Sequence, residues 1–359
     1  MSLSELLRDP ETIRHWNGGE IAISSRIRLA RNLAGHSFPD WAGETECAQV
    51  WERLRAVWPE CPALKPYRMA ANDELTPLDR QVLVERHLAS RELSRKGRGS
   101  GIVVREDLRV SVMVNEEDHL RIQILGLGLC LDDLWRKMEE LDRQIEEHVP
   151  MAYCGRLGYL TACPTNVGTG LRASVMLHLP GLALTNDLPG VLRAVAKLGL
   201  TARGFWGEGT EAVGHFYQIS NQITLGDTEH RLIASLDSVV REVMDHERNA
   251  RQRLLENRPA VLYDHVGRAY GILSHAHLLA THEAIALLSA LRLGVVMGMV
   301  SSVDRAMLDA MLIAVQPGHI QMLSERALDA HERDEWRARL VREWLSPPRR
   351  RSPRKKKNG

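Results

Sequence analysis

The chain has 359 residues, enough for about two domains, and its 44% hydrophobic and 26% charged residues are ordinary for a globular protein. The net charge is +1, the most apolar run (residues 284–300) is broken by Arg292, and the N-terminus lacks the apolar core of a signal peptide, which argues against a membrane or secreted protein. The five cysteines form no CxxC pair, which argues against a disulfide framework or a zinc site. We therefore expect a cytoplasmic protein with no membrane partner.

Residues 20–32 (EIAISSRIRLARN) alternate between apolar and polar side chains, as a strand does. The pattern predicts one face with Ile21, Ile23, Ile27 and Leu29 and with Ser25 among them, and an opposite face with Ser24, Arg26 and Arg28. Further along the chain, Thr76 and Pro77 are typical of the N-cap and the first position of a helix, which would carry His87 near its end.

Residues 108–125 predict a strand, a polar turn (NEED, residues 115–118) and a second strand. Apolar spacings of three and four then predict an amphipathic helix over residues 131–145. Residues 171–179 predict another strand, with Arg172, Ser174 and Met176 on its polar face. A long amphipathic helix is expected from about Thr228, and from about Arg258 onward the chain shows helical spacing with almost no strand signal.

These elements predict an α+β fold: an antiparallel sheet with helices on one face and an open working face, followed by an all-helical domain. We expect an N-terminal extension (1–19), a catalytic domain (20–255), a helical C-terminal domain (256–345) and a disordered basic tail (346–359). The tail holds seven of the 47 Lys and Arg residues and leaves a body with 40 basic and 46 acidic residues. We interpret it as a solubilising end; the alternative is docking to acidic partners or nucleic acid.

Arginines recur on the polar faces of the predicted strands, at Arg26, Arg28, Arg121, Arg172 and Arg203. Strand arginines are costly on a covered face unless they are paired, and a cluster of guanidinium groups matches several phosphates at once. Two interpretations remain open at this point: a triphosphate clamp built from arginines, or a network of structural ion pairs. Carboxylates stand close by in the sequence, in the turn at Glu116, Glu117 and Asp118 and in the glycine-flanked loop with Glu208 and Glu211.

Four segments in this order, SSRIRLARN, NEEDHLRI, GYLTACPTNVGTGLRAS and RGFWGEGTEAVGHFYQISNQ, resemble the guanidino kinases, which include arginine kinase, creatine kinase and the bacterial protein-arginine kinases of the McsB type. The matches span residues 20 to about 250. Three features favour the McsB type. SSRIRLAR begins only 24 residues into the chain, so the N-terminal helical domain of the small-molecule kinases is not expected. Trp206 stands where those kinases place an arginine, and RDEWRA (residues 333–338) resembles the motif that recognises phosphoarginine.

The resemblance implies ATP and Mg²⁺ as cofactors, with no residue assigned as a metal ligand. It implies an ATP site made of three sets of residues: Ser24, Ser25, Arg26, Ile27 and Arg28; His87, Arg121, Arg172, Ala173, Ser174, Val175 and Met176; and Arg203, Gly204, Phe205, Trp206, Gly207 and Glu208. Glu117 matches the glutamate that holds the target guanidinium, and its partner is either Glu208 or Glu211. Cys163 resembles the reactive cysteine near that guanidinium, which either assists by charge or acts as an oxidation switch.

For the C-terminal region the resemblance implies an allosteric phosphoarginine site, formed by Arg333, Asp334, Glu335, Trp336, Arg337 and Ala338. Arg333 and Arg337 are one helical turn apart and would share a face. We therefore expect a kinase that phosphorylates arginines exposed on proteins and marks them for a Clp-type protease. The expected partners are a zinc-containing activator, a Clp ATPase and a second copy in a homodimer, and not nucleic acid. The alternatives are a kinase for free arginine or another small guanidino metabolite, and a phosphoarginine-binding adaptor with little catalysis.

Overall fold

The computed structural model describes residues 2–9, 11–14, 18–204, 212–324 and 326–346. Its centre is an eight-stranded sheet in which every pair of neighbouring strands is antiparallel. In sheet order the strands are β2 (Tyr67–Ala71), β3 (Gly101–Arg105), β4 (Val110–Val114), β5 (Leu120–Leu127), β1 (Ala22–Arg31), β8 (Leu171–His178), β10 (Phe216–Asn221) and β9 (Leu200–Gly204). A small hairpin, β6 (Tyr153–Cys154) and β7 (Gly158–Tyr159), lies outside this sheet. The α+β prediction with an antiparallel sheet is confirmed.

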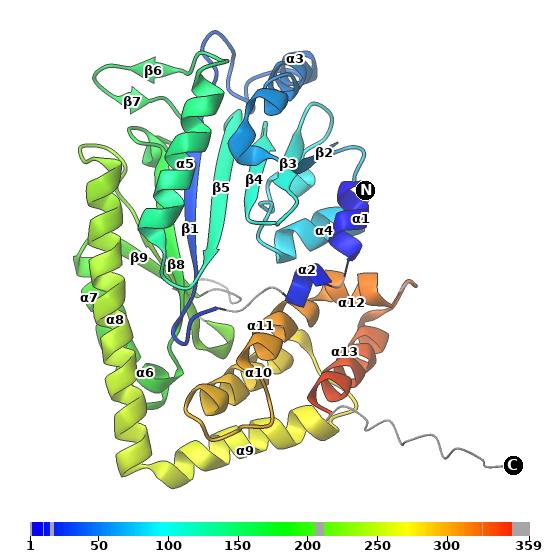
Figure 1. Cartoon of the computed structure of the whole chain (residues 1–359), viewed down its shortest axis with the longest axis vertical. Helices are drawn as coiled ribbons and strands as arrows, with labels where there is room; N and C mark the ends of the chain where they lie inside the picture. Colours follow the sequence, from blue (N-terminus) through cyan, green and yellow to red (C-terminus); the bar gives the residue numbers. More distant parts are fainter. Residues whose placement is uncertain (1, 10, 15–17, 205–211, 325, 347–359) are drawn as a thin grey trace, which may run out of the picture.

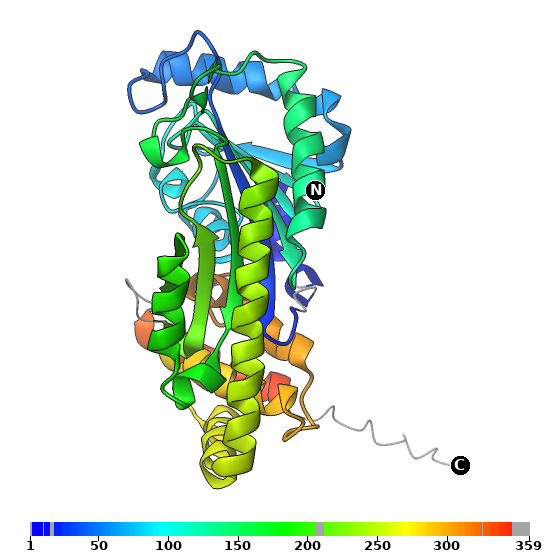
Figure 2. The same cartoon turned by 90° about the vertical axis from the view of Figure 1, so that its left-hand side faces the viewer.

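Two long helices, α5 (Leu131–Glu146) and α8 (Glu229–Asn257), cover one face of the sheet (Figures 1 and 2). Their apolar stripes are buried as their spacing predicts, and they join the strand residues Ile27, Leu29 and Ala173 in the main core. This burial stabilises the fold mainly through the hydrophobic effect. It also leaves the polar residues of β1, β5 and β8 on the opposite face.

The opposite face is covered at both ends and bears the polar residues between them. Towards β2–β4, α1 (Leu3–Arg8) and α4 (Pro77–Glu85) pack on it, in a cluster that includes Met113 and Leu125. Thr76 caps α4 in a capping box with Asp79, so the predicted N-cap is confirmed. At the other end Ile23 packs with Met176 and Phe216 against the C-terminal helices. The prediction that Ile23 shares a face with Ile21 is wrong, because the β1–β8 register shifts between Ala22 and Ser24.

The C-terminal part is helical, as predicted: α9 (Pro259–His275), α10 (Thr281–Val296), α11 (Arg305–Ala314), α12 (Pro317–Leu323) and α13 (Ala330–Leu345). These helices gather at one end of the sheet, with α12 beside α4 (Figure 1). A fully buried arginine holds this region to the start of β1: Arg292 pairs with Asp309 at 2.7 Å and donates to the carbonyl oxygens of Gly19 and Glu20. Nowhere in the described ranges is a helix long and apolar enough to cross a membrane.

Of the other α-helices, α2 (Glu11–Arg14) precedes the first strand. The helices α3 (Glu44–Arg55), α6 (Pro180–Leu184) and α7 (Leu188–Lys197) connect strands.

Candidate active site

Five arginines, which we call the arginine row, stand on or beside the uncovered strands: Arg26, Arg28, Arg121, Arg172 and Arg203. Arg28 of β1 lies directly opposite Arg172 of β8, and Gln123 of β5 lies opposite Arg28 on the other side. Arg121 is two residues from Gln123, and therefore shares its face. Arg203 of β9 pairs with Gln218 of β10, which in turn pairs with Met176. The predicted arginines are thus brought together.

The arginine row is electrostatically strained, because like charges directly opposite each other in a sheet destabilise it. Burial, together with Arg26, Arg121 and Arg172, lowers the pKa of Arg28 well below its ordinary value. Burial and the neighbouring arginines also lower the pKa of Arg26, to about 10, and that of Arg172. Each of these shifts means that the charged form is disfavoured in the folded protein.

Among the residues that the structure describes, protein groups neutralise only part of this charge. Arg121 is held by Glu116, whose two carboxylate oxygens each lie 2.8 Å from Nη1, and this pairing raises the pKa of Arg121 against the opposing effect of burial. Arg26 donates to the neutral Gln218 at 2.7 Å. The buried Nε atoms of Arg28 and Arg172 find no hydrogen-bond partner among the residues that the structure describes. Their donors fit a polyanion such as a nucleotide triphosphate.

His87 lies beside the arginine row, just beyond the end of α4, so the prediction that this helix carries His87 is wrong: the helix ends at Glu85 and Arg86 caps it. Its carbonyl oxygen accepts a hydrogen bond of 2.5 Å from Gln123, and its φ of 60° places it in the left-handed region. Burial and the charge of Arg26 lower the pKa of His87 to about 3. The imidazole is therefore neutral at physiological pH, and it adds a polar ring to the site without adding positive charge.

Four residues of the predicted ATP site turn their side chains to the covered face. Ser25 Oγ donates to the carbonyl oxygen of Gly128 at 2.8 Å, while Ile27, Ala173 and Val175 lie in the main core. Only the backbone atoms of these four residues can therefore contribute to the site. Ser24 and Ser174 lie on the same face as Arg26, and Gly204 ends β9. Phe205, Trp206, Gly207, Glu208 and Glu211 lie outside the described residues.

The turn between β4 and β5 gives its three carboxylates different environments. Glu116 is paired with Arg121, and Asp118 accepts hydrogen bonds from Asn32 at 2.6 Å and from the Ala162 amide at 2.7 Å. Glu117 between them is half-buried, and burial and the charges of Asp118 and Glu116 raise its pKa. A half-buried carboxylate with a raised pKa beside a cationic cluster is a candidate for proton transfer.

Asp118 also anchors the segment that carries Cys163, through the Ala162 amide. The Cys163 Sγ atom lies 2.9 Å from Thr165 Oγ1, and the interaction of Cys163 with Arg172 partly opposes the lowering of the pKa of Arg172. The thiol therefore lies near both the arginine row and the turn that bears Glu117. The sequence shows Asn32 as part of a strand and gives no sign that it supports this turn.

Gly168 and Gly170 follow Cys163 with φ values of 110° and 65°. A Cβ on Gly168 would lie 2.4 Å from the Thr224 carbonyl oxygen, and one on Gly170 2.6 Å from that of Ala30. The close approach is therefore to the protein's own backbone, and the glycines fix where β8 and Arg172 begin.

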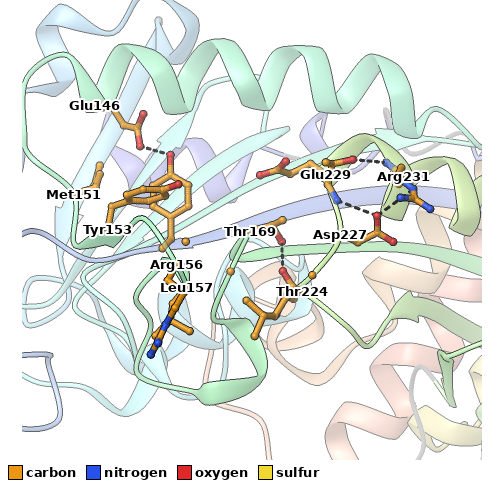
Figure 3. Close-up of a pocket in the computed structure, with 16 residues that line it drawn as sticks. Glu146, Met151, Tyr153, Arg156, Leu157, Thr169, Thr224, Asp227, Glu229 and Arg231 are labelled. Atoms are coloured by element: carbon orange, nitrogen blue, oxygen red, sulfur yellow. Dashed lines mark hydrogen bonds and ion pairs between the residues drawn. The ribbon is translucent and has the colours of Figure 1, made fainter.

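A separate cavity of about 860 Å³ borders Gly168 and Thr169, next to the start of β8 (Figure 3). Glu146 of α5, the hairpin residues Tyr153 and Arg156, and Asp227 and Arg231 near the start of α8 line it from different sides. Asp227 pairs with Arg231, and Thr169 donates to the Thr224 carbonyl oxygen. None of the described residues that line this cavity belongs to the arginine row, so it is not where the predicted ATP site lies.

The RDEWRA motif lies on α13, and its arginines differ in exposure. Arg337 is 1% exposed and donates to the carbonyl oxygens of Val315 and Leu279 and to Asp334. Arg333 is half-buried and donates to the Leu328 carbonyl oxygen. Glu335 and Trp336 line a cavity of about 480 Å³, together with the basic residues His277, Arg326, His331, Arg339 and Arg342. Arg337 therefore stabilises the packing of α13, and the basic side chains that line the cavity are those of the neighbouring residues just named.

Comparisons with known proteins agree with this geometry. Residues 50–250 match the family described as ATP:guanido phosphotransferase, C-terminal catalytic domain, and residues 259–357 match the protein-arginine kinase McsB C-terminal domain. A protein-arginine kinase of Halothermothrix orenii is 43% identical over 351 residues, which cover 96% of this chain and 100% of the relative. One of Symbiobacterium thermophilum is 45% identical over 333 residues, which cover 91% and 94%.

This chain belongs to the protein-arginine kinase family. Protein-arginine kinases are phosphotransferases of the guanidino-kinase type, and solved guanidino kinases share the fold of this one. Lombricine kinase is 25% identical with a TM-score of 0.57, covering 67% of this chain and 70% of the neighbour. The duplicated taurocyamine kinase of Schistosoma mansoni is 25% identical with a TM-score of 0.59, covering 73% and 37%.

The strain in the arginine row predicts the effect of Arg172→Gln on this protein-arginine kinase. Because the pKa of Arg172 is lowered in the folded protein, removing its charge relieves repulsion, and the Tm of the free protein should stay unchanged or rise. The increase in Tm caused by Mg-ATP should shrink to less than about half. Scanning calorimetry with and without Mg-ATP measures both quantities.

Arg31→Gln is the matched control, because Arg31 is buried on the covered side and paired with Asp142 at 2.6 Å. Its loss should lower the free energy of unfolding by about 3–5 kcal/mol and leave the shift caused by Mg-ATP intact. A large drop in the Tm of free Arg172→Gln would show that Arg172 is a structural residue.

Proposed function

We propose that this protein-arginine kinase transfers the γ-phosphoryl group of ATP to arginine side chains of proteins. The observation that carries the proposal is the pairing of an incompletely neutralised arginine row with a carboxylate of raised pKa, Glu117, in the adjoining turn. The row suits the phosphates, and the carboxylate suits the guanidinium that accepts the phosphoryl group.

Arginine is a difficult nucleophile, since its guanidinium is cationic with a pKa above about 12. Glu117 and a second carboxylate, Glu208 or Glu211, would hold it bidentately, orient one terminal nitrogen and accept its proton as the N–P bond forms. Cys163 would either assist the guanidinium by its charge or serve as a site of oxidation. The raised pKa of Glu117 makes it a better proton acceptor than an ordinary glutamate.

ATP and Mg²⁺ complete the site in this proposal. Arg28 and Arg172, with their buried Nε donors, would bind phosphate oxygens, and Arg121, kept charged by Glu116, would stabilise charge that develops on the transferred group. No group of three or more His, Cys, Asp or Glu residues suited to a metal occurs within the described ranges. We expect Mg²⁺ to be bound largely through phosphate oxygens, as it is in many kinases.

The two parts of the chain divide the work in our proposal. Residues 20–255 catalyse the transfer, and residues 256–345 recognise phosphoarginine on or near α13, which makes the enzyme responsive to its own product. The basic side chains around Trp336 support this, because Arg326, Arg339 and Arg342 line one cavity with it. Three further parts of the proposal are drawn from the family. The kinase would mark proteins for a Clp ATPase, bind a zinc-containing activator and form a homodimer.

The direct test of the reaction is to incubate the kinase with Mg-ATP and a model protein and to search for acid-labile phosphoarginine by mass spectrometry. Glu117→Gln should lower kcat at least about 100-fold while the Kd for ATP changes less than about threefold, because only contacts to the acceptor are lost. Labelling of free arginine alone would support a small-molecule kinase. Glu117→Gln with nearly normal turnover would contradict the role of Glu117.

The pH dependence of kcat tests the environment of Glu117. The carboxylate must be ionised to accept a proton, so kcat should fall as the pH drops through its raised pKa, above the range of an ordinary glutamate. Asp118→Asn removes one of the charges that raise this pKa, yet an asparagine oxygen can still accept from Asn32 and Ala162. The acidic limb of the profile should therefore move to lower pH. A limb that does not move would assign it to another group.

A further inference from the structure

We infer that helix α12 of the C-terminal region supports the ATP site, because its contact with Glu85 positions His87. The inference rests on the proposed function, in which His87 contacts the nucleotide. Glu85 and Arg86 end α4 and His87 follows at once, so three consecutive residues connect the C-terminal helices to the arginine row.

Glu85 binds the N-terminus of α12. Its carboxylate oxygens accept hydrogen bonds from the backbone amides of Gly318 at 2.7 Å and His319 at 3.0 Å. These amides belong to the first turn of the helix, where N–H groups have no partner within the helix and a negative charge is favoured. A Cβ on Gly318 would lie 2.9 Å from both carboxylate oxygens, so a larger residue here would make the Glu85 carboxylate shift.

The side chain of His319 closes the same contact from the other side. Its Nδ1 lies 2.7 Å from Glu85 Oε2, and its Nε2 accepts a hydrogen bond of 3.0 Å from Arg86 Nε. Because an arginine nitrogen can only donate, Nε2 carries no hydrogen and Nδ1 donates to Glu85. Burial lowers the pKa of His319, in keeping with this neutral form.

Arg86 extends the network to the N-terminal segment. It is 3% exposed, and it donates to the Leu7 carbonyl oxygen at 2.6 Å and to Thr12 Oγ1 at 2.7 Å. Glu85 and Arg86 are thus fixed by groups from both ends of the chain. The next residue, His87, holds a left-handed backbone conformation that is uncommon for a non-glycine residue and needs support from its surroundings.

The turn that leads into α12 is held by the RDEWRA motif. Arg337 donates through Nε at 2.8 Å to the carbonyl oxygen of Val315, which caps α11 two residues before α12 begins. A continuous set of buried and half-buried contacts therefore runs from Arg337 through the start of α12 and Glu85 to His87. If α12 only packed on α4, none of these polar groups would be needed for ATP binding. Replacing them would then lower the stability of the protein and leave the KM for ATP unchanged.

The test is the KM for ATP of Glu85→Gln, measured with phosphoarginine formation on a model protein. Glutamine keeps the volume but replaces one acceptor oxygen with a donor that faces the α12 amides or His319, so at least one hydrogen bond is lost and the contact is weakened. We expect the KM for ATP to rise at least about fivefold, while the KM for the protein and kcat at saturating ATP change less than about twofold.

Glu247→Gln is the matched control. Glu247 is buried, accepts from the Gly181 and Leu182 amides at 2.8 and 2.9 Å at the start of α6, and pairs with Arg251. It should lower the Tm comparably and leave the KM for ATP unchanged. If Glu85→Gln also lowers only the Tm, the positioning role is wrong. His319→Asn, which keeps a donor for Glu85 but loses the link to Arg86, gives a milder variant that should also raise the KM for ATP.

His87→Ala separates this inference from the proposed function. It should raise the KM for ATP, and Glu85→Gln added to it should raise it no further, because both changes disturb one element. A rise with His87→Ala but none with Glu85→Gln or His319→Asn would overturn the positioning role and leave the ATP site standing. No rise with His87→Ala would overturn the positioning role and remove His87 from the ATP site, while the arginine row and Glu117 would still be tested by their own variants.

Discussion

Arg28 and Arg172 face each other across β1 and β8, and the rest of the site is arranged around this repulsion. Two guanidinium groups opposite each other on a partly buried sheet are unfavourable, and Glu116, the described carboxylate that is hydrogen-bonded to the row, is paired with Arg121 and not with either of them. The strain persists because α5 and α8 bury the other face of the same strands. A bound polyphosphate would relieve it, so the arginines are already arranged to receive such a ligand.

The supports of the site come from distant parts of the chain. Asn32 and Asp118 connect the turn that bears Glu117 to the segment that bears Cys163, and Glu85 connects α4 to α12. In our proposals the helical C-terminal region thus supports the nucleotide side of the site and also carries the segment that resembles the phosphoarginine motif. Such an arrangement would suit an enzyme whose product is recognised by its own C-terminal region.

The sequence predicted the strands and helices whose burial is one-sided. β1, β5 and β8 alternate cleanly because one face is core and the other carries the arginines. β3 (GIVVR) is buried almost throughout, so its residues show no alternation. The site residues came from the arginine spacing and the family resemblance. Three features depend on tertiary packing, which local sequence patterns do not report. They are the register that places Arg28 opposite Arg172, the burial of Arg337 and the Glu85–His319 contact.

Calorimetric titration of the kinase with Mg-tripolyphosphate, Mg-ATP and adenosine tests the central claim most directly. If relief of repulsion in the arginine row drives nucleotide binding, tripolyphosphate should bind with a Kd within about tenfold of that of ATP, and its affinity should fall steeply as salt rises. Adenosine should bind far more weakly. Binding of adenosine as tight as that of ATP, with no binding of tripolyphosphate, would contradict the account.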